Sequence, residues 1–198
     1  MDRHPAGPTP RIVVQRTAAL WLLCGAVGCG ASVDDPAPMT DAGPRTVLWS
    51  GSTGCDAIAV DADAVYFTGD GELRRMAKDG SDQTALASDA YACDLAVDDD
   101  SVYFVNTGTV SAPGTALVRV AKAGGAAFDL LADLLLPERL AMSSTRVFAT
   151  TSPATGRGIV AVEKAGGVPA VISSTYAFDL VADDSDVIWS ERRAAARC

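Results

Sequence analysis

The sequence predicts an all-β fold made of β-propeller blades, and three observations support this prediction. First, residues 58–88 contain a four-strand pattern in which β-branched and aromatic runs alternate with glycine and aspartate turns. Second, the pattern recurs along the chain at intervals of about 40 residues. Third, the 198 residues include 18 glycines and show almost no helical periodicity. Four-stranded units at this period are typical of propeller blades, which must stack on neighbours to bury their faces.

The first unit has the clearest strand and turn signals. Gly69-Asp70-Gly71 follows a β-branched and aromatic run and predicts a tight hairpin. Lys78-Asp79-Gly80-Ser81 is a second turn, in which glycine supplies a positive φ and aspartate can bond its own backbone. The unit is therefore expected to be an antiparallel meander with strands at residues 58–60, 65–68, 73–77 and 84–87.

The same pattern begins again at three later positions. An apolar run, a turn rich in Asp or Ser, and a second apolar run start at Ile58, Leu95, Leu140 and Leu180, which are 37, 45 and 40 residues apart. A propeller normally needs at least about four blades to close, so we expect an incomplete ring. The expected blades are residues 56–88, 94–132 and 139–174, with the start of a fourth at 179–190 and a partial propeller over 46–198 as a whole.

The residues of the first unit resemble a known blade sequence. Tyr66-Phe67-Thr68, then Leu73-x-Arg75, then Asp79-Gly80-Ser81-x-x-Thr84-x-Leu86 is similar to the YWTD blade of low-density lipoprotein receptor-type six-bladed propellers and of related bacterial propellers. Later units keep only Val-aromatic and Lys-x-Gly-Gly, and the resemblance covers about three and a half blades. It implies a scaffold for binding on a secreted or lipid-anchored protein, and it supports the fold better than the function because such propellers bind unrelated ligands.

The N-terminus has the features of an export signal. Arg11 and Arg16 precede an apolar run that ends in small residues, which is the pattern of a signal peptide over residues 1–28. The run is shorter than the roughly 20 apolar residues that a bilayer-spanning helix needs. Ala26-Val27-Gly28-Cys29 resembles a bacterial lipobox, although its first position is usually Leu, and this implies lipidation of Cys29. The alternative is an ordinary cleaved signal with an incidental cysteine.

Export sets the expected location of the protein. By analogy with lipoproteins, Gly30 after Cys29 suits an outer-membrane lipoprotein, so we expect the cell envelope, at the outer membrane or in the periplasm. Residues 29–45 are rich in Pro and Asp and predict a disordered tether. The formal net charge is −9, which argues against nucleic acid as a partner and fits an acidic surface outside the cytoplasm.

The ends of the repeat region predict an open ring. Residues 46–50 align with the last strands of later units, so we expect them to complete a final blade whose partners lie near the C-terminus. The sequence stops about two strands into the fourth unit, which predicts a truncated copy of a longer protein or closure by a second chain. Open blade edges predict self-association.

Two cysteines are candidates for a disulfide. Cys55 and Cys93 stand before the innermost strand of consecutive units. A disulfide is allowed in an oxidising compartment but requires Cα atoms within about 7 Å, so two small buried residues are the alternative. No metal site is expected, because neither His nor a CxxC motif accompanies them.

Charged residues recur at two places in each unit. Asp61, Asp98 and Asp183 lie in the first hairpins and are interpreted as turn formers rather than as a ring of cation sites, because the third unit has Ser143 there. A lysine precedes a glycine turn at positions 78, 122 and 164. It could contact an anionic ligand, but it is more often a solvated guard of a strand edge.

The sequence offers no catalytic constellation. The single histidine, His4, lies in the expected signal peptide, so Ser-His and Cys-His arrangements are not expected in the mature chain. We therefore predict no enzyme and no cofactor, and a scaffold that binds a protein, peptide or glycan through one end of the ring. The apolar innermost strands favour this hypothesis over a propeller hydrolase of the lactonase or glycosidase type, which acids and Asn lining the channel would favour. A non-functional gene remnant is a further alternative.

Overall fold

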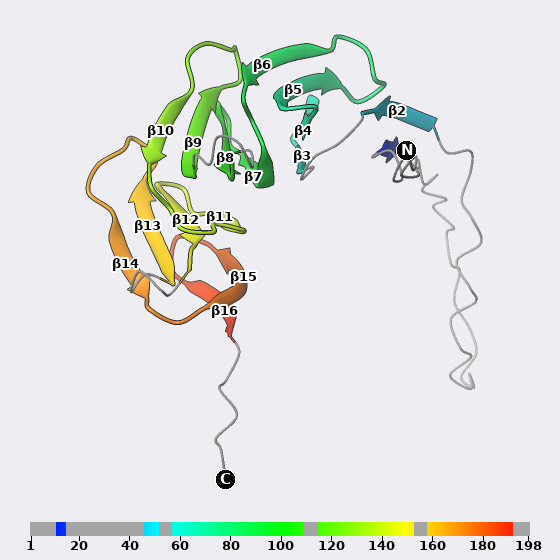
Figure 1. Cartoon of the computed structure of the whole chain (residues 1–198). Helices are drawn as coiled ribbons and strands as arrows, with labels where there is room; N and C mark the ends of the chain where they lie inside the picture. The colour runs from blue at the N-terminus through cyan, green and yellow to red at the C-terminus, as the bar shows by residue number, and fades with distance from the viewer. Residues whose placement is uncertain (1–10, 15–45, 52–56, 109–114, 153–157, 192–198) are drawn as a thin grey trace, which may run out of the picture. The chain divides into compact units, whose positions relative to one another are not determined.

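The computed structural model describes residues 11–14, 46–51, 57–108, 115–152 and 158–191, and these form strands and turns without any helix (Figure 1). In this described part there is accordingly no helix able to cross a membrane. The predicted all-β class is confirmed. The chain divides into two compact units, Met1–Ser50 and Gly51–Cys198.

The described part of the first unit is a two-stranded antiparallel sheet. β1 (Arg11–Val14) pairs with β2 (Thr46–Ser50), and Arg11 stands opposite Ser50. We expected residues 46–50 to pair with a strand near the C-terminus, but in this structure their partner is β1. β1 belongs to the segment expected to be the signal peptide, so completion of a final blade by residues 46–50 remains a prediction.

The second unit contains three four-stranded antiparallel sheets and a two-stranded one, each with its strands in chain order. Adjacent strands in a sheet are successive in the chain, as in the predicted meander. Their bounds are β3 (Ile58–Val60), β4 (Ala64–Gly69), β5 (Glu72–Ala77) and β6 (Thr84–Ser88); β7 (Ala92–Val97), β8 (Ser101–Asn106), β9 (Ala116–Ala121) and β10 (Phe128–Leu131); β11 (Leu140–Met142), β12 (Arg146–Thr150), β13 (Ile159–Glu163) and β14 (Ala170–Ser173); and β15 (Ala177–Ala182) and β16 (Val187–Glu191).

The tight turn between β4 and β5 shows why the sequence signals were informative. Asp70 and Gly71 both have positive φ, at 54° and 78°, which is the conformation of a two-residue hairpin turn. Gly71 is also needed for space, because a Cβ there would lie 2.8 Å from the hydroxyl oxygen of Tyr91. The residue types at this turn therefore set the register of β4 against β5.

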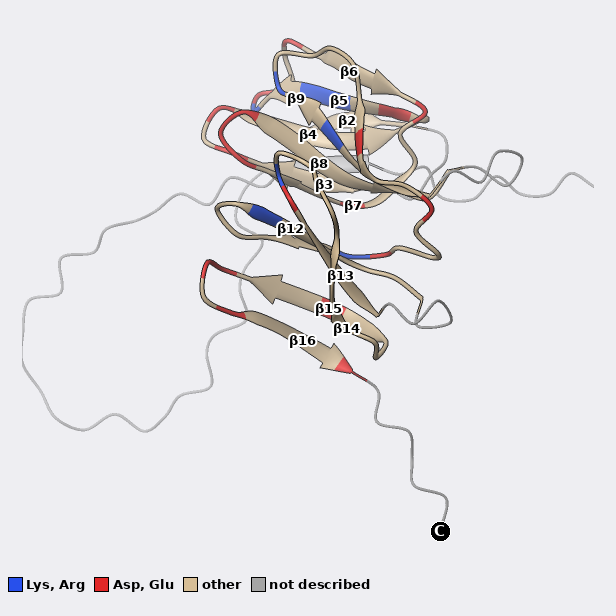
Figure 2. Cartoon of the chain, turned by 90° about the vertical axis from the view of Figure 1, so that its left-hand side faces the viewer, with Lys and Arg blue, Asp and Glu red and all other residues tan. Residues whose placement is uncertain are grey.

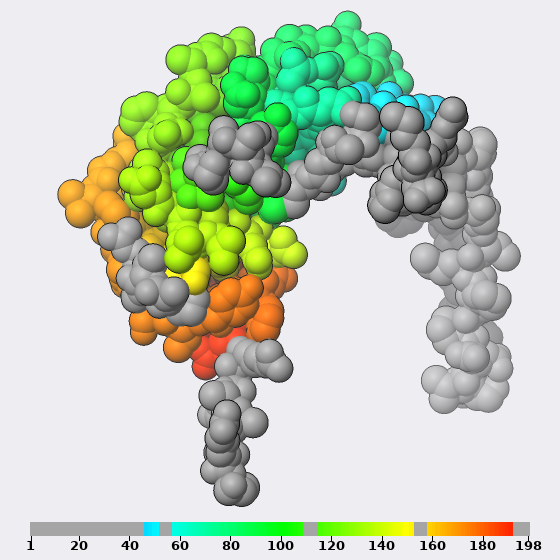
Figure 3. All heavy atoms as spheres, in the orientation of Figure 1, coloured from blue at the N-terminus to red at the C-terminus, as the bar shows by residue number. Residues whose placement is uncertain are grey.

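The four sheets of the second unit follow one another with their innermost strands side by side. β3 lies beside β7, β7 beside β11, and β11 beside β15, all on the inner side of the unit (Figure 1). The space-filling view shows the sheets packed in chain order (Figure 3). This arrangement of antiparallel sheets is that of propeller blades, and closure into a ring is not seen among the described residues.

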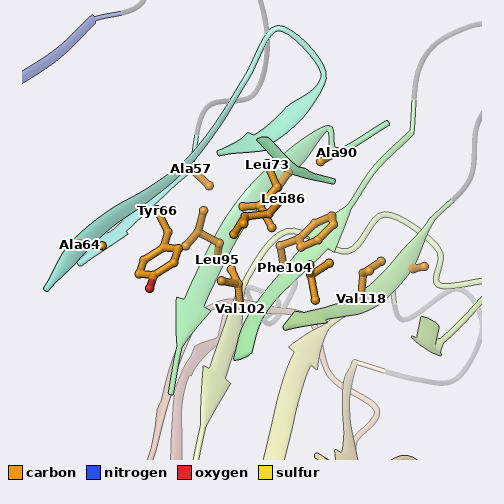
Figure 4. Close-up of a cluster of buried hydrophobic side chains, with 13 residues drawn as sticks. Ala57, Ala64, Tyr66, Leu73, Leu86, Ala90, Leu95, Val102, Phe104 and Val118 are labelled. Atoms are coloured by element: carbon orange, nitrogen blue, oxygen red, sulfur yellow. The ribbon is translucent and has the colours of Figure 1, made fainter. Parts of the chain in front are cut away.

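A separate hydrophobic core fills the space between each pair of successive sheets. The first core includes Leu73 from the first sheet and Leu95 and Phe104 from the second, and their side chains lie between the two sheets (Figure 4). Two further cores join the second sheet to the third and the third to the fourth. We call the face of a sheet that covers the next sheet its forward face, and the opposite one its backward face.

Candidate functional site

Two ion-paired clusters join successive sheets on the side of the first hairpins. In the first, Asp61 Oδ1 accepts the backbone N–H groups of Asp63 and Ala64, both at 2.8 Å, which closes the turn between β3 and β4. Asp61 Oδ2 accepts the Tyr66 hydroxyl at 3.1 Å and Lys122 Nζ, from the second sheet, at 2.6 Å. One carboxylate therefore closes its own hairpin through hydrogen bonds and links its sheet to the neighbouring sheet through an ion pair.

The same arrangement is repeated one sheet further on. Asp98 Oδ1 accepts the N–H groups of Asp100 and Ser101, at 3.1 and 2.9 Å. Asp98 Oδ2 accepts the Tyr103 hydroxyl at 3.0 Å and lies 3.0 Å from Lys164 Nζ of the third sheet. We call Asp61–Tyr66–Lys122 and Asp98–Tyr103–Lys164 the two clamps.

The clamps are partly withdrawn from water. The side chains of Lys122 and Lys164 are 17% and 16% exposed, and each ammonium lies over the tyrosine ring of its clamp, 5.3 and 5.6 Å from the centroid. Cation–π attraction and partial burial make such pairs stronger than exposed ion pairs. The prediction that the lysines are solvated strand guards is therefore wrong for Lys122 and Lys164, whereas Lys78 is exposed.

The electrostatics follow from these contacts. Burial opposes ionisation of Asp61 and Asp98, but hydrogen bonds from the lysine, the turn N–H groups and the tyrosine outweigh it and lower the pKa of both carboxyls. Burial, together with the Asp98 carboxylate, raises the pKa of Tyr103 to about 12. The carboxylates of both clamps are thus ionised at neutral pH.

The third sheet shows the same turn without the charge. Ser143 occupies the place of Asp61 and Asp98, and its Oγ accepts the N–H of Arg146 at 3.1 Å, while Phe148 replaces the tyrosine. In the clamps the lysine follows the third strand of the next sheet, and the fourth sheet has two strands among the described residues. A neutral serine fits this interface because a half-buried carboxylate without a cation is unfavourable.

Lowering the pH below about 4 is expected to weaken both clamps. Because the folded-state pKa of Asp61 lies below its unfolded value, its contribution to the free energy of unfolding is complete above about pH 4 and is lost as pH falls through the folded pKa. Asp61→Asn should therefore lose less stability than the wild type between about pH 5 and pH 2, by on the order of 1 kcal/mol.

Urea denaturation of both proteins across that range measures the difference. Asp94, whose pKa is raised, has the opposite sign and gains relative stability on acidification, but it is present in both proteins and its effect cancels in the comparison. Equal pH slopes for wild type and Asp61→Asn would contradict a depressed pKa of Asp61 in the folded state.

A second charged cluster lies at the innermost strands β7, β11 and β15. Asp94, Arg139 and Asp179 directly precede Leu95, Leu140 and Leu180, the core residues of β7, β11 and β15. Asp94 Oδ2 accepts the N–H of Leu140 at 2.9 Å, which links the second sheet to the third. We call Asp94, Arg139 and Asp179 the mouth cluster.

The three members of the mouth cluster interact electrostatically. Burial of the Asp94 carboxyl raises its pKa, the Leu140 N–H and the Arg139 guanidinium act against this, and the Asp179 carboxylate adds to the rise. Arg139 and Asp179 are exposed, so they are available to a ligand. Beside them, the Tyr176 hydroxyl donates to Glu138 Oε2 at 3.0 Å. The cluster therefore presents negative charges on strands β7 and β15 and a positive charge directly before β11.

The mouth cluster was not found from the sequence. The prediction of function rested on the apolar residues of the innermost strands, whereas the informative position was the charged residue just before each leucine. Acids lining the channel are the feature that would favour a hydrolase over a scaffold, and Asp94 and Asp179 lie on innermost strands. In the part of the chain that the structure describes, no group of three or more His, Cys, Asp or Glu is placed to hold a metal ion.

The cysteines are only partly covered by the described residues. Cys93 is disulfide-bonded. Cys55 and Cys29 lie outside the described residues, so the Cys55–Cys93 pairing and the lipidation of Cys29 remain predictions.

The comparisons define the class of protein by its fold. A chain in the crystal structure of a nidogen/laminin complex is similar with a TM-score of 0.57 and 14% identity, over 75% of this chain and 60% of that one. A structural genomics protein of unknown function from Bacteroides thetaiotaomicron gives 0.50 and 14%, over 68% and 38%. The nidogen/laminin neighbour, which is of the YWTD type, supports a propeller fold. The chain spans less than two thirds of the length of these two neighbours.

A particular family is not defined. The sequence matches no protein-family model and no curated protein. A gluconolactonase from Xanthomonas campestris is similar with a TM-score of 0.45 and 16% identity, over 74% of this chain and 72% of that one. The prediction that the protein is not an enzyme is therefore corrected: one structural neighbour is an enzyme, and the fold does not establish enzymatic activity either way.

Proposed function

We propose that the protein is an exported, lipid-anchored propeller that binds a protein or peptide ligand at the mouth cluster. The observation that carries the proposal is the electrostatic interaction of Asp94 on β7 with Asp179 on β15 and with Arg139, which directly precedes β11. Arginine presents a planar fork of donors that suits a carboxylate, and the aspartates suit a cationic group. A polypeptide segment supplies both kinds of group, and the two aspartates lie on strands, where side chains are held more rigidly than on loops.

Two further observations support a binding role. A chain of the same fold occurs in a nidogen/laminin complex, so the fold is compatible with protein partners. The segment before the propeller has the composition of a signal peptide, a lipobox and a tether, with Cys29 as the lipid attachment site. A tethered module outside the cytoplasm would present the mouth cluster to ligands in the envelope.

Arg139→Ala is expected to weaken ligand binding about tenfold or more, the effect of losing roughly 1.4 kcal/mol of a charge-assisted contact. The probes are an immobilised array of peptides and an array of glycans, each incubated with the full chain. Arg146→Ala is the matched control, because Arg146 is an exposed arginine of the same sheet that pairs with Glu163 in the first hairpin region. Identical profiles for the wild type and Arg139→Ala, or signals confined to glycans, would overturn the proposal.

A hydrolase of the propeller lactonase or glycosidase type is the second candidate. It is favoured by one observation: the mouth cluster holds two carboxyls in different environments, Asp94 with a raised pKa and Asp179 exposed. Such pairs separate acid and base roles in hydrolytic sites. Turnover of gluconolactone or of nitrophenyl glycosides that is lost in Asp94→Asn would support this candidate, and absence of turnover in the wild type would count against it.

A further inference from the structure

The forward face of the fourth sheet is uncovered. In the first three sheets the equivalent positions pack into the cores, as for Tyr103 and Phe148. In the fourth sheet the equivalent residues Val181 and Ile188, which stand opposite each other, are 62% and 64% exposed. Two open hollows of about 270 and 260 Å³ lie over this face, and both are lined by these two residues. The face therefore has the composition of an inter-sheet interface without its partner.

In the same sheet, Asp183 corresponds to the aspartate of a clamp, but no lysine partner is seen for it among the described residues. It occupies the hairpin position of Asp61 and Asp98, and its Oδ1 accepts the N–H groups of Ser185 and Asp186, both at 2.8 Å. In the two clamps the other carboxylate oxygen binds a lysine from the next sheet. Among the described residues no lysine or arginine pairs with Asp183. Its hairpin is the acidic turn between β15 and β16 (Figure 2).

In the first sheet, Lys78 corresponds to the lysine of a clamp, but no aspartate partner is seen for it among the described residues. It occupies the position of Lys122 and Lys164, directly after the third strand of its sheet, but it is exposed. Within the described ranges it has no carboxylate partner, whereas Lys122 and Lys164 each bind an aspartate of the preceding sheet. The first sheet thus carries a cation where a preceding sheet would supply an acid.

The backward face of the first sheet is open along its innermost strand. Ile58 and Val60 are 56% and 60% exposed, whereas the leucines at the position of Ile58 in later sheets are covered: Leu95, Leu140 and Leu180 are 5%, 7% and 4% exposed. On the same face Phe67 and Met76 are already buried. The accessible part of this face is therefore the innermost strand together with Lys78.

We propose that the fourth sheet of one copy binds the first sheet of a second copy, with Lys78 of one chain paired to Asp183 of the other. The partner is a second copy because one chain carries both Asp183 and Lys78. Between two copies these residues can form the same aspartate–lysine pair that joins successive sheets within each chain. The contact joins different surfaces, so it is head-to-tail and builds closed rings or open chains of copies rather than a twofold dimer. It does not depend on the ligand proposed for the mouth cluster.

Charge reversal tests the pairing. Sedimentation velocity of the full chain over a concentration series should show association, and Lys78→Glu and Asp183→Lys should each weaken it about tenfold or more, because each places like charges together. In a mixture of the two single variants every contact between unlike chains joins opposite charges, so the mixture should recover association, as should the double variant. Asp129→Lys, the same charge change at an exposed position of β10, is the matched control and should associate like the wild type.

Cross-linking supplies a second measurement that does not depend on variants. A carbodiimide joins an ammonium to a carboxylate in contact, so a mixture of isotopically light and heavy protein should yield a mixed Lys78–Asp183 peptide. Unchanged melting temperatures would show that the exposed substitutions leave the fold intact. A monomer at all concentrations, association that ignores both single variants, or cross-links confined to one isotope would overturn the proposal.

Discussion

Gly158→Ala is expected to destabilise the third sheet by about 4 kcal/mol or more, a large part of the stability of an ordinary domain. A Cβ at this position would lie 1.8 Å from the carbonyl oxygen of Thr175. The Gly158 backbone cannot move away easily, because its N–H donates to Ser173 at 2.7 Å and its carbonyl accepts from Thr151 at 3.0 Å. Thermal and urea denaturation followed by circular dichroism would measure the loss.

Gly124→Ala is the control for this prediction. A Cβ at Gly124 meets no atom within 4 Å, but the residue has a φ of 84°, so alanine there costs only backbone strain of about 1 kcal/mol. Similar melting temperatures for the two variants would show that the close approach of Gly158 to Thr175 is not a constraint on the folded chain.

Phe104→Ala is expected to lower the free energy of unfolding by about 3–5 kcal/mol. Phe104 is 2% exposed and lies in the core between the first and second sheets (Figure 4). Its truncation removes buried apolar contacts and leaves a cavity between the two sheets. Because sheets of this kind are stable only when stacked, the loss should separate the first sheet from the second rather than disturb one hairpin.

Phe128→Ala is the matched substitution at the surface. Phe128 is 50% exposed and its ring centroid lies 5.4 Å from the Arg119 guanidinium, so its loss should cost no more than about 1 kcal/mol. Urea midpoints measured on both variants give the comparison. A Phe104 variant as stable as the Phe128 variant would mean that the core between the first two sheets does not hold them together.

The fold could be predicted because its signals are local. The strand and turn residues around Asp70 and Gly71 specify a hairpin within a few positions, and repetition of the unit revealed the stacking of sheets. The partner of residues 46–50 could not be predicted in the same way. Alignment identified a last strand of a blade, whereas the observed pairing with residues 11–14 joins segments with no shared pattern.

The sites were harder to predict because they join residues that are distant in sequence. The aspartates were correctly interpreted as turn formers, but each uses its second oxygen for a lysine of the next sheet, so neither Asp61 nor Lys122 reveals the pair by itself. The repeats of aspartate and of lysine are both visible in the sequence, but a repeat alone does not show that the aspartate of one sheet pairs with the lysine of the next. The mouth cluster similarly appears only when the innermost strands are placed side by side.

The clamps also bear on the order in which the protein is made. In each clamp the aspartate is synthesised before the lysine and can already bond to the backbone of its own hairpin. The lysine follows 61 residues later for Asp61 and 66 residues later for Asp98. Domains are folded from the N-terminus during synthesis. Each folded sheet that carries such an aspartate therefore presents a carboxylate oxygen to the lysine of the next sheet. Because the same pair recurs at successive interfaces, whole repeats could be added or removed in evolution without a new kind of contact between sheets.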